Sequence, residues 1–242
     1  MVGLSLTASI HTAFAHTGAV SAMEVAILGG TGDIGEGLAL RWGRDTAHAV
    51  TVGSRDDGRA RDAAADYRTR LEERGHEATI DGAANPEAAT GADVVVVGVP
   101  PYHVADTVEA VADGLSGVLV SPAVGMQRDE AGMHYHRPGA GSVTAVAADA
   151  APGDVPVVGA FHPIPAHRLA DLDAELGLHV PVVADDDDAR ETVVDLADDI
   201  DGLTGLDGGP LANAPEIEGL TPLLINLARR NEDLSALGVR FE

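Results

Sequence analysis

Short apolar runs alternate with longer amphipathic stretches over residues 23–166. Runs of β-branched residues are typical of buried strands, whereas apolar residues three or four positions apart indicate helices, as Ile34, Leu38 and Trp42 do. Strands are therefore predicted at 24–28, 49–52, 77–80, 94–99, 118–120 and 155–160, and helices at 34–44, 58–75, 104–112 and 143–150. This alternation predicts an α/β fold, a doubly wound parallel sheet with helices on both faces.

The pattern changes after about residue 166. One more strand is predicted at 178–183, a helix at 189–199, a glycine-rich turn at 202–209 and a long helix at 216–230. We therefore expect two domains, a larger one over 23–166 and a small C-terminal α/β domain over 167–242. The acidic run 185–188 is interpreted as a solvated helix N-terminus, where the helix dipole favours carboxylates; a cation site is the alternative.

The first 22 residues are mildly apolar and end in small residues, as signal peptides do, but they contain no Lys or Arg. We interpret residues 1–22 as a disordered N-terminal extension, with the folded chain beginning at Met23. The longest apolar runs, 94–99 and 156–161, fall far below the ~20 residues that a membrane-spanning helix needs. The sequence therefore predicts no membrane segment.

Acidic residues outnumber basic ones by 39 to 15, which gives a net charge of −24, and every basic residue is arginine. Such a surface opposes binding to nucleic acid or anionic membranes, because neutralising phosphates needs a basic face. Dense carboxylates instead suit a cytoplasm rich in salt, where screening weakens their repulsion, so we expect a cytoplasmic protein of halophilic type. The absence of cysteine excludes disulfides, thiolate metal sites and a cysteine nucleophile.

A glycine motif lies between the first predicted strand and the first predicted helix. Gly30, Gly32 and Gly35 form G-x-G-x-x-G in the sequence GTGDIG. In a dinucleotide-binding turn the first glycine permits the bend, the second lets the backbone approach a pyrophosphate, and the third lets helix and strand pack closely. Together with the strands and helix around it, the motif predicts a Rossmann-type fold that binds a dinucleotide at the helix N-terminus. A glycine-rich turn without a ligand is the alternative.

The end of the second predicted strand indicates which dinucleotide is bound. An NAD enzyme would place Asp or Glu there, whereas this chain has Ser54 and Arg55, with Arg59 one helical turn later. Guanidinium groups can bracket a 2′-phosphate that a carboxylate would repel, so NADP is the predicted cofactor. The alternative is that the two arginines only pair with nearby acidic residues, Asp56, Asp57 and Asp62.

The sequence contains no convincing acid–base constellation. The histidines considered are His103, His134, His136, His162, His167 and His179. No third ligand accompanies His134 and His136, so no metal site is predicted. His162 follows the sixth predicted strand and could act as a general acid or hydrogen-bond at a pocket wall; we favour the pocket wall.

Several ordered segments resemble the F420-dependent NADP oxidoreductases. They are 25–41, 52–55, 120–122, 162–166, 180–187, 201–211, 220–227 and 237–241. The resemblance implies a Rossmann domain for NADP and a small C-terminal domain that encloses the deazaflavin coenzyme F420. It also implies reversible hydride transfer between the two coenzymes, and a homodimer.

The resemblance further implies roles for individual residues. Pyrophosphate would contact Thr31, Gly32, Asp33 and Ile34, and the 2′-phosphate would contact Ser54, Arg55 and Arg59. The nicotinamide would lie beside Val120 and Ala166, and the deazaflavin pocket would include His162, Thr221 and Leu237. Asp33 stands where family members often have Asn.

Hydride transfer between two coenzymes explains why no catalytic side chain is evident. Both reacting carbons belong to the coenzymes, so the protein has to hold two rings in contact and exclude water. Two other functions fit the residues. One is an NADP-dependent reductase of a small imine or carbonyl, which needs a proton donor; the other is a non-catalytic NADP-binding module.

Overall fold

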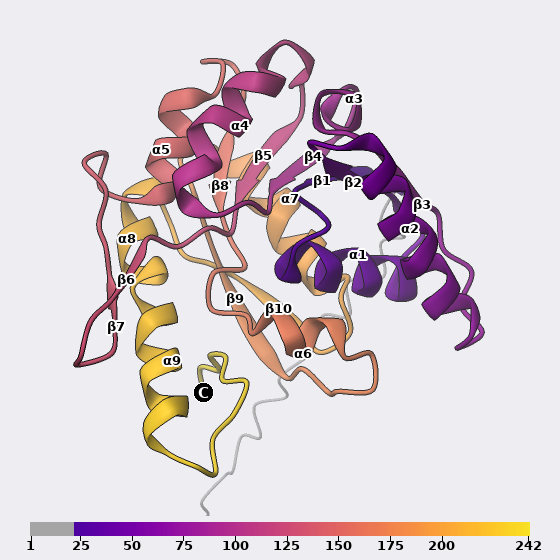
Figure 1. Cartoon of the computed structure of the whole chain (residues 1–242). Helices are drawn as coiled ribbons and strands as arrows, with labels where there is room; N and C mark the ends of the chain where they lie inside the picture. The colour runs from indigo at the N-terminus through magenta and orange to yellow at the C-terminus, as the bar shows by residue number, and fades with distance from the viewer. Residues whose placement is uncertain (1–21) are drawn as a thin grey trace, which may run out of the picture.

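The computed structural model describes residues 22–242, in which helices cover both faces of an eight-stranded sheet (Figure 1). The expectation for residues 1–22 thus lies outside the described residues, apart from the last of them. The strands are β1 (Glu24–Leu28), β2 (Ala49–Ser54), β3 (Ile80–Ala84), β4 (Val94–Val97), β5 (Val118–Ser121), β6 (Met126–Arg128), β7 (Met133–Tyr135), β8 (Val157–Gly159), β9 (Leu178–Ala184) and β10 (Leu203–Asp207). The helices are α1 (Asp33–Asp45), α2 (Asp57–Glu72), α3 (Asn85–Ala89), α4 (Val104–Val111), α5 (Val143–Ala150), α6 (Ala166–Ala170), α7 (Asp187–Asp198), α8 (Ala214–Glu218) and α9 (Leu220–Arg230).

The strand order of the sheet confirms the predicted fold class. The sheet runs β10-β9-β8-β5-β4-β1-β2-β3, and all neighbours from β3 to β8 are parallel. This is the Rossmann order 3-2-1-4-5-6, whose direction reverses between β1 and β4. At such a switch point the loops after the two strands diverge and leave a crevice for a ligand.

The residues after 166 add the two outer strands to the same sheet. Strand β9 pairs antiparallel with β8, and β10 pairs parallel with β9. A hairpin of β6 and β7 stands apart as a separate two-stranded sheet. The described structure does not test the division into domains at residue 166, which stays a prediction.

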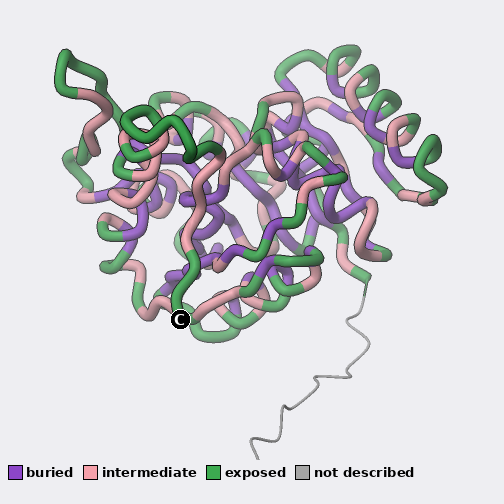
Figure 2. Tube along the Cα trace, turned by 90° about the horizontal axis from the view of Figure 1, so that it is seen from below, coloured by how far each residue is buried: buried purple, intermediate pink, exposed green. Residues whose placement is uncertain are grey.

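Alternate residues of the central strands face opposite apolar layers. Val25 and Ile27 of β1 pack with α1, α2 and α7, whereas Ala26 and Leu28 pack with α3, α4 and α5. Figure 2 shows these strands as buried segments enclosed by a more exposed periphery. The continuous apolar runs of the sequence thus reflect strands that are covered on both faces.

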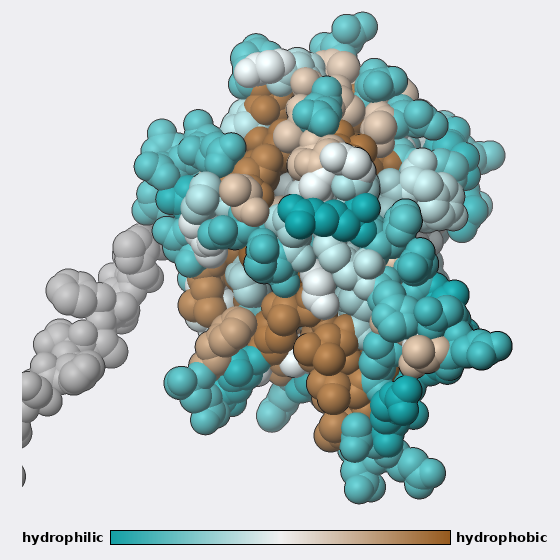
Figure 3. All heavy atoms as spheres, turned by 90° about the vertical axis from the view of Figure 1, so that its left-hand side faces the viewer, coloured by the Kyte–Doolittle hydropathy of each residue, from teal (hydrophilic) through white to brown (hydrophobic). Residues whose placement is uncertain are grey.

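Helix α9 packs against the β6–β7 hairpin on one side and leaves large apolar side chains exposed. Pro222 is its one buried residue, and Leu223 and Leu227 are 53% and 41% exposed. Figure 3 looks onto the side that carries α9 and the β6–β7 hairpin, and brown, apolar surface lies low on this face. No helix in residues 22–242 is both long and apolar enough to cross a bilayer.

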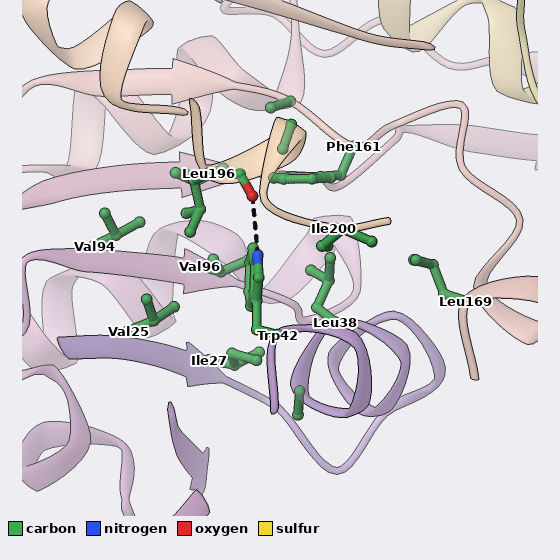
Figure 4. Close-up of a cluster of buried hydrophobic side chains, with 14 of the residues drawn as sticks. Val25, Ile27, Leu38, Trp42, Val94, Val96, Phe161, Leu169, Leu196 and Ile200 are labelled. Atoms are coloured by element: carbon green, nitrogen blue, oxygen red, sulfur yellow. Dashed lines mark hydrogen bonds between the residues drawn. The ribbon is translucent and has the colours of Figure 1, made fainter. Parts of the chain in front are cut away.

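Trp42 of α1 lies in the larger apolar layer, between the side chains of the inner strands and those of α7 (Figure 4). Its indole Nε1 donates to the carbonyl oxygen of Leu196 in α7 at 3.0 Å, and its ring meets Phe161 edge-on. This fully buried side chain therefore links α1 to α7, the helix that packs on the outer strands β9 and β10.

Three predictions of secondary structure were wrong, and each involves a glycine or another small residue. The stretch predicted as a glycine turn contains β10, because Gly205 is needed for close approach of α7: a Cβ there would lie 2.6 Å from the Val194 oxygen. Strand β3 begins at Ile80, where the prediction for 77–80 ended. Its later residues are small and were not recognised as a strand, and a Cβ on Gly82 would collide with the Ala60 backbone of α2. The helix predicted at 216–230 is interrupted at Gly219.

Candidate functional site

The glycine motif forms a tight turn between β1 and α1. The Gly30 amide donates to the carbonyl oxygens of Ile27 and Gly53, both at 3.0 Å, which holds the turn against β1 and β2. A Cβ at Gly35 would lie 2.5 Å from the Gly30 Cα, so this glycine is required for helix and turn to meet. At Gly32 an added Cβ would lie 3.3 Å from the Gly29 oxygen, a tight contact, and this glycine lines the groove described next.

A groove of about 570 Å³ lies at the switch point between β1 and β4. Its floor is backbone, because glycines from the two strand ends meet there: a Cβ on Gly29 would lie 3.0 Å from the Gly98 oxygen. Of the predicted NADP-binding residues, the groove is lined by Thr31, Gly32, Ser54, Arg55 and Arg59. Asp33 and Ile34 form the first turn of α1 at its edge.

The arginines at the groove are unpaired within residues 22–242. Neither the Arg55 nor the Arg59 side chain makes a hydrogen bond or ion pair with another described residue, and both are exposed. The neighbouring carboxylates of Asp56 and Asp57 bind other groups instead of these two guanidinium groups. Asp56 accepts from the Arg59 backbone amide at 2.8 Å as the N-cap of α2, and Asp57 pairs with Arg61 at 3.0 Å. Two cationic groups are therefore available beside the groove.

Several residues that line the groove were not among the predicted site residues, and two of them carry polar side chains able to bind a ligand, Asn85 and His103. Asn85 begins α3 and is 7% exposed, and its side-chain oxygen has no partner within the described chain. His103 ends a short 3₁₀ turn after β4 and lines the groove from the β4 side. The signal for His103 was available, because it follows the strand predicted at 94–99 at its carboxyl end. Asn85 was missed because the third strand was predicted to end at residue 80, whereas β3 ends at Ala84.

The carboxyl ends of β5 and β8 lie side by side and carry a second polar cluster. Ser121 ends β5, is fully buried, and has a hydroxyl without a partner in residues 22–242. Phe161, just after β8, has a φ of 65°, a conformation that costs a non-glycine residue about 1–3 kcal/mol. Strain and unpartnered polar atoms at a sheet's carboxyl edge are typical of binding sites.

His162 follows Phe161 and is 4% exposed. Its Nε2 lies 3.3 Å from the Thr144 hydroxyl, and its Nδ1 has no partner within the described chain. Burial lowers the pKa of His162 from 6.5 to about 3. The ring is therefore neutral near pH 7, which fits a hydrogen-bonding residue better than a charged general acid.

The remaining predicted residues lie in different surroundings. Val120 is fully buried in the apolar layer beside α1. Ala166 begins α6 and lies against α1, since a Cβ added to Gly37 would be 3.2 Å from the Ala166 carbonyl oxygen. Thr221 donates to the His162 carbonyl oxygen at 2.8 Å, whereas Leu237 lies in the tail that returns to β9. The structure thus brings Thr221 to His162 and leaves Val120 outside the groove lining.

The fold and the groove define a nucleotide-binding α/β protein of the Rossmann class. Residues 24–125 match the family model described as NADP oxidoreductase, coenzyme F420-dependent. The chain is 36% identical over 208 residues to an F420-dependent NADP reductase of Methanocaldococcus jannaschii, covering 85% of this chain and 92% of that protein. It is 37% identical over 227 residues to one of Methanothermobacter thermautotrophicus, covering 92% and 96%. The chain therefore belongs to the F420-dependent NADP reductase family.

A solved structure supports the fold over most of the chain. The protein is from Arthrobacter sp. FB24 and is described as a candidate F420-dependent NADP reductase. Its TM-score is 0.74 at 22% identity, covering 91% of this chain and 99% of that one. At this identity the likeness concerns the fold alone, and it includes the region after residue 166.

Proposed function

We propose that this protein catalyses reversible hydride transfer between NADP(H) and the deazaflavin coenzyme F420. The observation that carries the proposal is the groove at the switch point, with two unpaired arginines beside it in a chain of the F420-dependent NADP reductase family. Its relatives carry the name F420-dependent NADP reductase, which supplies the second coenzyme.

The groove would hold the phosphates of NADP through backbone amides and arginines. Thr31, Gly32, Asp33 and Ile34 would surround the pyrophosphate, because no side chain caps the N-terminus of α1 and its backbone amides can donate to an anion. Ser54, Arg55 and Arg59 would bind the 2′-phosphate. Charge-assisted bonds of this kind are about twice as strong as neutral ones, which separates NADP from NAD.

The nicotinamide and the deazaflavin would meet at the carboxyl edge of β5 and β8. The coenzymes supply the hydride donor and acceptor, so the chain has to orient two rings and exclude water, which can contribute ~7–11 kcal/mol to lowering the barrier. Val120 and Ala166 would support the nicotinamide side. His162, Thr221 and Leu237 would border the deazaflavin, with His162 neutral and no side chain acting as an acid or base.

The apolar surface of α9 supports a homodimer. Leu223 and Leu227 of α9 are large apolar side chains that the described residues leave exposed. Large apolar side chains gathered on one face are typical of protein interfaces. The acidic composition further supports a cytoplasmic location at high salt.

A direct assay tests the function. Mixing the protein with NADPH and oxidised F420 in molar salt should bleach the deazaflavin absorbance, and NADP with reduced F420 should restore it. NADP binding without any bleaching would instead support a non-catalytic NADP-binding module.

The same assay separates hydride transfer from an imine or carbonyl reductase. The hydride passes between two ring carbons, and the proton that the reduced deazaflavin takes up on a ring nitrogen can come from water. Because no side chain has to supply it, His162→Ala should lower kcat about tenfold or less. A loss of several orders of magnitude, with NADP binding retained, would assign His162 the role of an acid.

A further inference from the structure

Glu218 is a carboxylic acid in the interior of a strongly acidic protein. It ends α8 and is fully buried, and the mechanism proposed above does not use it. Its Oε2 accepts from the Tyr135 hydroxyl at 2.8 Å and from the Val143 amide at 3.0 Å. Its Oε1 accepts from the Thr144 amide and from the Thr144 hydroxyl, both at 3.0 Å. Each oxygen therefore faces two donors.

The two amides belong to the first turn of α5, so Glu218 occupies the amino end of that helix. The helix dipole favours a negative group there, and a backbone N–H can only donate. A charged acceptor binds a hydroxyl proton more strongly than a neutral nitrogen does. The hydroxyl proton of Thr144 is thus directed to Glu218.

This arrangement determines where the proton of His162 lies. Once the Thr144 hydroxyl donates to Glu218, its oxygen has only an acceptor site left for the His162 ring. The ring nitrogen 3.3 Å away, Nε2, must then carry the proton and donate it. In a neutral imidazole the other nitrogen, Nδ1, is left as an acceptor. Nδ1 has no donor within residues 22–242.

Helix α9, which follows α8 directly, holds the backbone of His162. Thr221, in the first turn of α9, donates to the His162 carbonyl oxygen at 2.8 Å. Glu218 and Thr221 lie three residues apart, so the α8–α9 unit fixes both the ring and the main chain of one histidine. Both contacts fall on the segment after β8, which contains the strained residue Phe161. The unpartnered hydroxyl of Ser121 lies at the end of the neighbouring strand β5.

We propose that Glu218 and Thr144 are positioning residues, which fix His162 as the Nε2–H tautomer and so present Nδ1 as a hydrogen-bond acceptor to an N–H group of a bound coenzyme. This rests on the proposed function, because both redox coenzymes carry such donors: the carboxamide of nicotinamide and the pyrimidine N–H of a deazaflavin. An acceptor at this position selects ligands with an N–H and contributes no proton to the reaction.

The tautomer can be measured without any ligand. In the full-length protein labelled with ¹⁵N-histidine, long-range ¹H–¹⁵N correlation spectra distinguish a nitrogen that carries a proton from one that does not. The His162 signals are assigned by their loss in His162→Gln. We expect a neutral ring with the proton on Nε2 at pH 7. A ring with its proton on Nδ1, or a charged ring, would overturn the proposal.

Matched variants test this hydrogen-bond relay, which runs from Glu218 through the Thr144 hydroxyl to His162 Nε2. Thr144→Val has nearly the same shape but no hydroxyl, so the Nδ1–H tautomer should become populated, whereas Thr144→Ser should keep the wild-type spectrum. In Glu218→Gln the charged acceptor is lost and the Thr144 hydroxyl is free to donate to Nε2, so Nδ1–H should again be populated. Unchanged spectra in Thr144→Val would exclude the relay, and unchanged spectra in Glu218→Gln alone would exclude the part of Glu218.

Kinetics with F420 and NADPH then identify the ligand. Thr144→Val should raise the KM of one coenzyme about fivefold with little change in kcat, and Thr144→Ser should restore it. A rise for F420 assigns the deazaflavin N–H, and a rise for NADPH assigns the carboxamide; a rise for neither would contradict a ligand contact at Nδ1. If the tautomer is as stated but F420 is never reduced, the proposed function fails and the relay stands.

Discussion

The groove after β1 and the cluster after β8 use polar groups in opposite ways. At the groove, Arg55 and Arg59 are exposed and unpaired among the described residues, and glycines leave the backbone open. At the cluster, Glu218, Thr144 and His162 are buried and bonded to one another. The groove is suited to bind a charged ligand from water, whereas the cluster is suited to hold a neutral ring in a fixed orientation.

The largest expected effect is on stability at the buried cluster. Glu218→Ala leaves two amides and two hydroxyls without an acceptor, so we expect the free energy of unfolding to fall by about 3–5 kcal/mol. Urea unfolding in constant molar salt measures it. Glu216→Ala, exposed on the same helix, is the control and should change it by less than about 0.5 kcal/mol. Equal effects of the two variants would show that the cluster does not stabilise the fold.

Arg55→Ala tests the exposed region. Loss of a charge-assisted contact should weaken NADP binding by about 1.5–3 kcal/mol and leave NAD binding nearly unchanged. Titration calorimetry measures both, with Arg61→Ala as the control, because Arg61 pairs with Asp57 on the same helix and lies outside the groove lining. Equal weakening of NADP and NAD would mean that Arg55 is structural.

The buried histidine predicts a dependence of stability on pH. Burial lowers the pKa of His162 from 6.5 to about 3, so over this range the unfolded chain binds a proton that the folded chain does not. The contribution of the neutral ring is complete above pH 6.5 and decreases as the pH falls toward 3; at pH 5 the loss is about 2 kcal/mol. His162→Gln should remove this part of the slope, and the exposed His167→Gln should not. Identical slopes in all three proteins would contradict a neutral, buried His162.

Asn85→Ala is expected to have the smallest effect. If its unpartnered amide oxygen meets the adenosine half of the coenzyme, the loss should be about 1 kcal/mol for NADP and NAD alike. Calorimetry with both nucleotides measures it. A loss confined to NADP would place Asn85 at the 2′-phosphate instead.

The sequence predicted the groove well because its signals are local. Gly30, Gly32 and Gly35 follow one strand directly, and Arg55 follows the next, so the parallel pairing of β1 with β2 is enough to bring them together. The fold class, a doubly wound and mostly parallel sheet, followed from the alternation of strands and helices.

The buried cluster could not be predicted in this way. Glu218 is 74 residues from Thr144 in sequence, and nothing in a strongly acidic chain marks it as the buried carboxylate. His162 was singled out, but its partners depend on how α8 and α9 return to the sheet edge. Strand β10 was missed because Gly205, read as a turn residue, serves close packing against α7.

Transfer of an isotopic label tests direct hydride passage between the two rings. NADPH carrying deuterium at the transferable C4 position is mixed with the protein and oxidised F420 in ordinary water, and the reduced F420 is analysed by mass spectrometry and NMR. We predict that the deuterium appears at C5 of the deazaflavin without exchange with solvent. Reduced F420 that carries hydrogen from water at C5 would contradict the account.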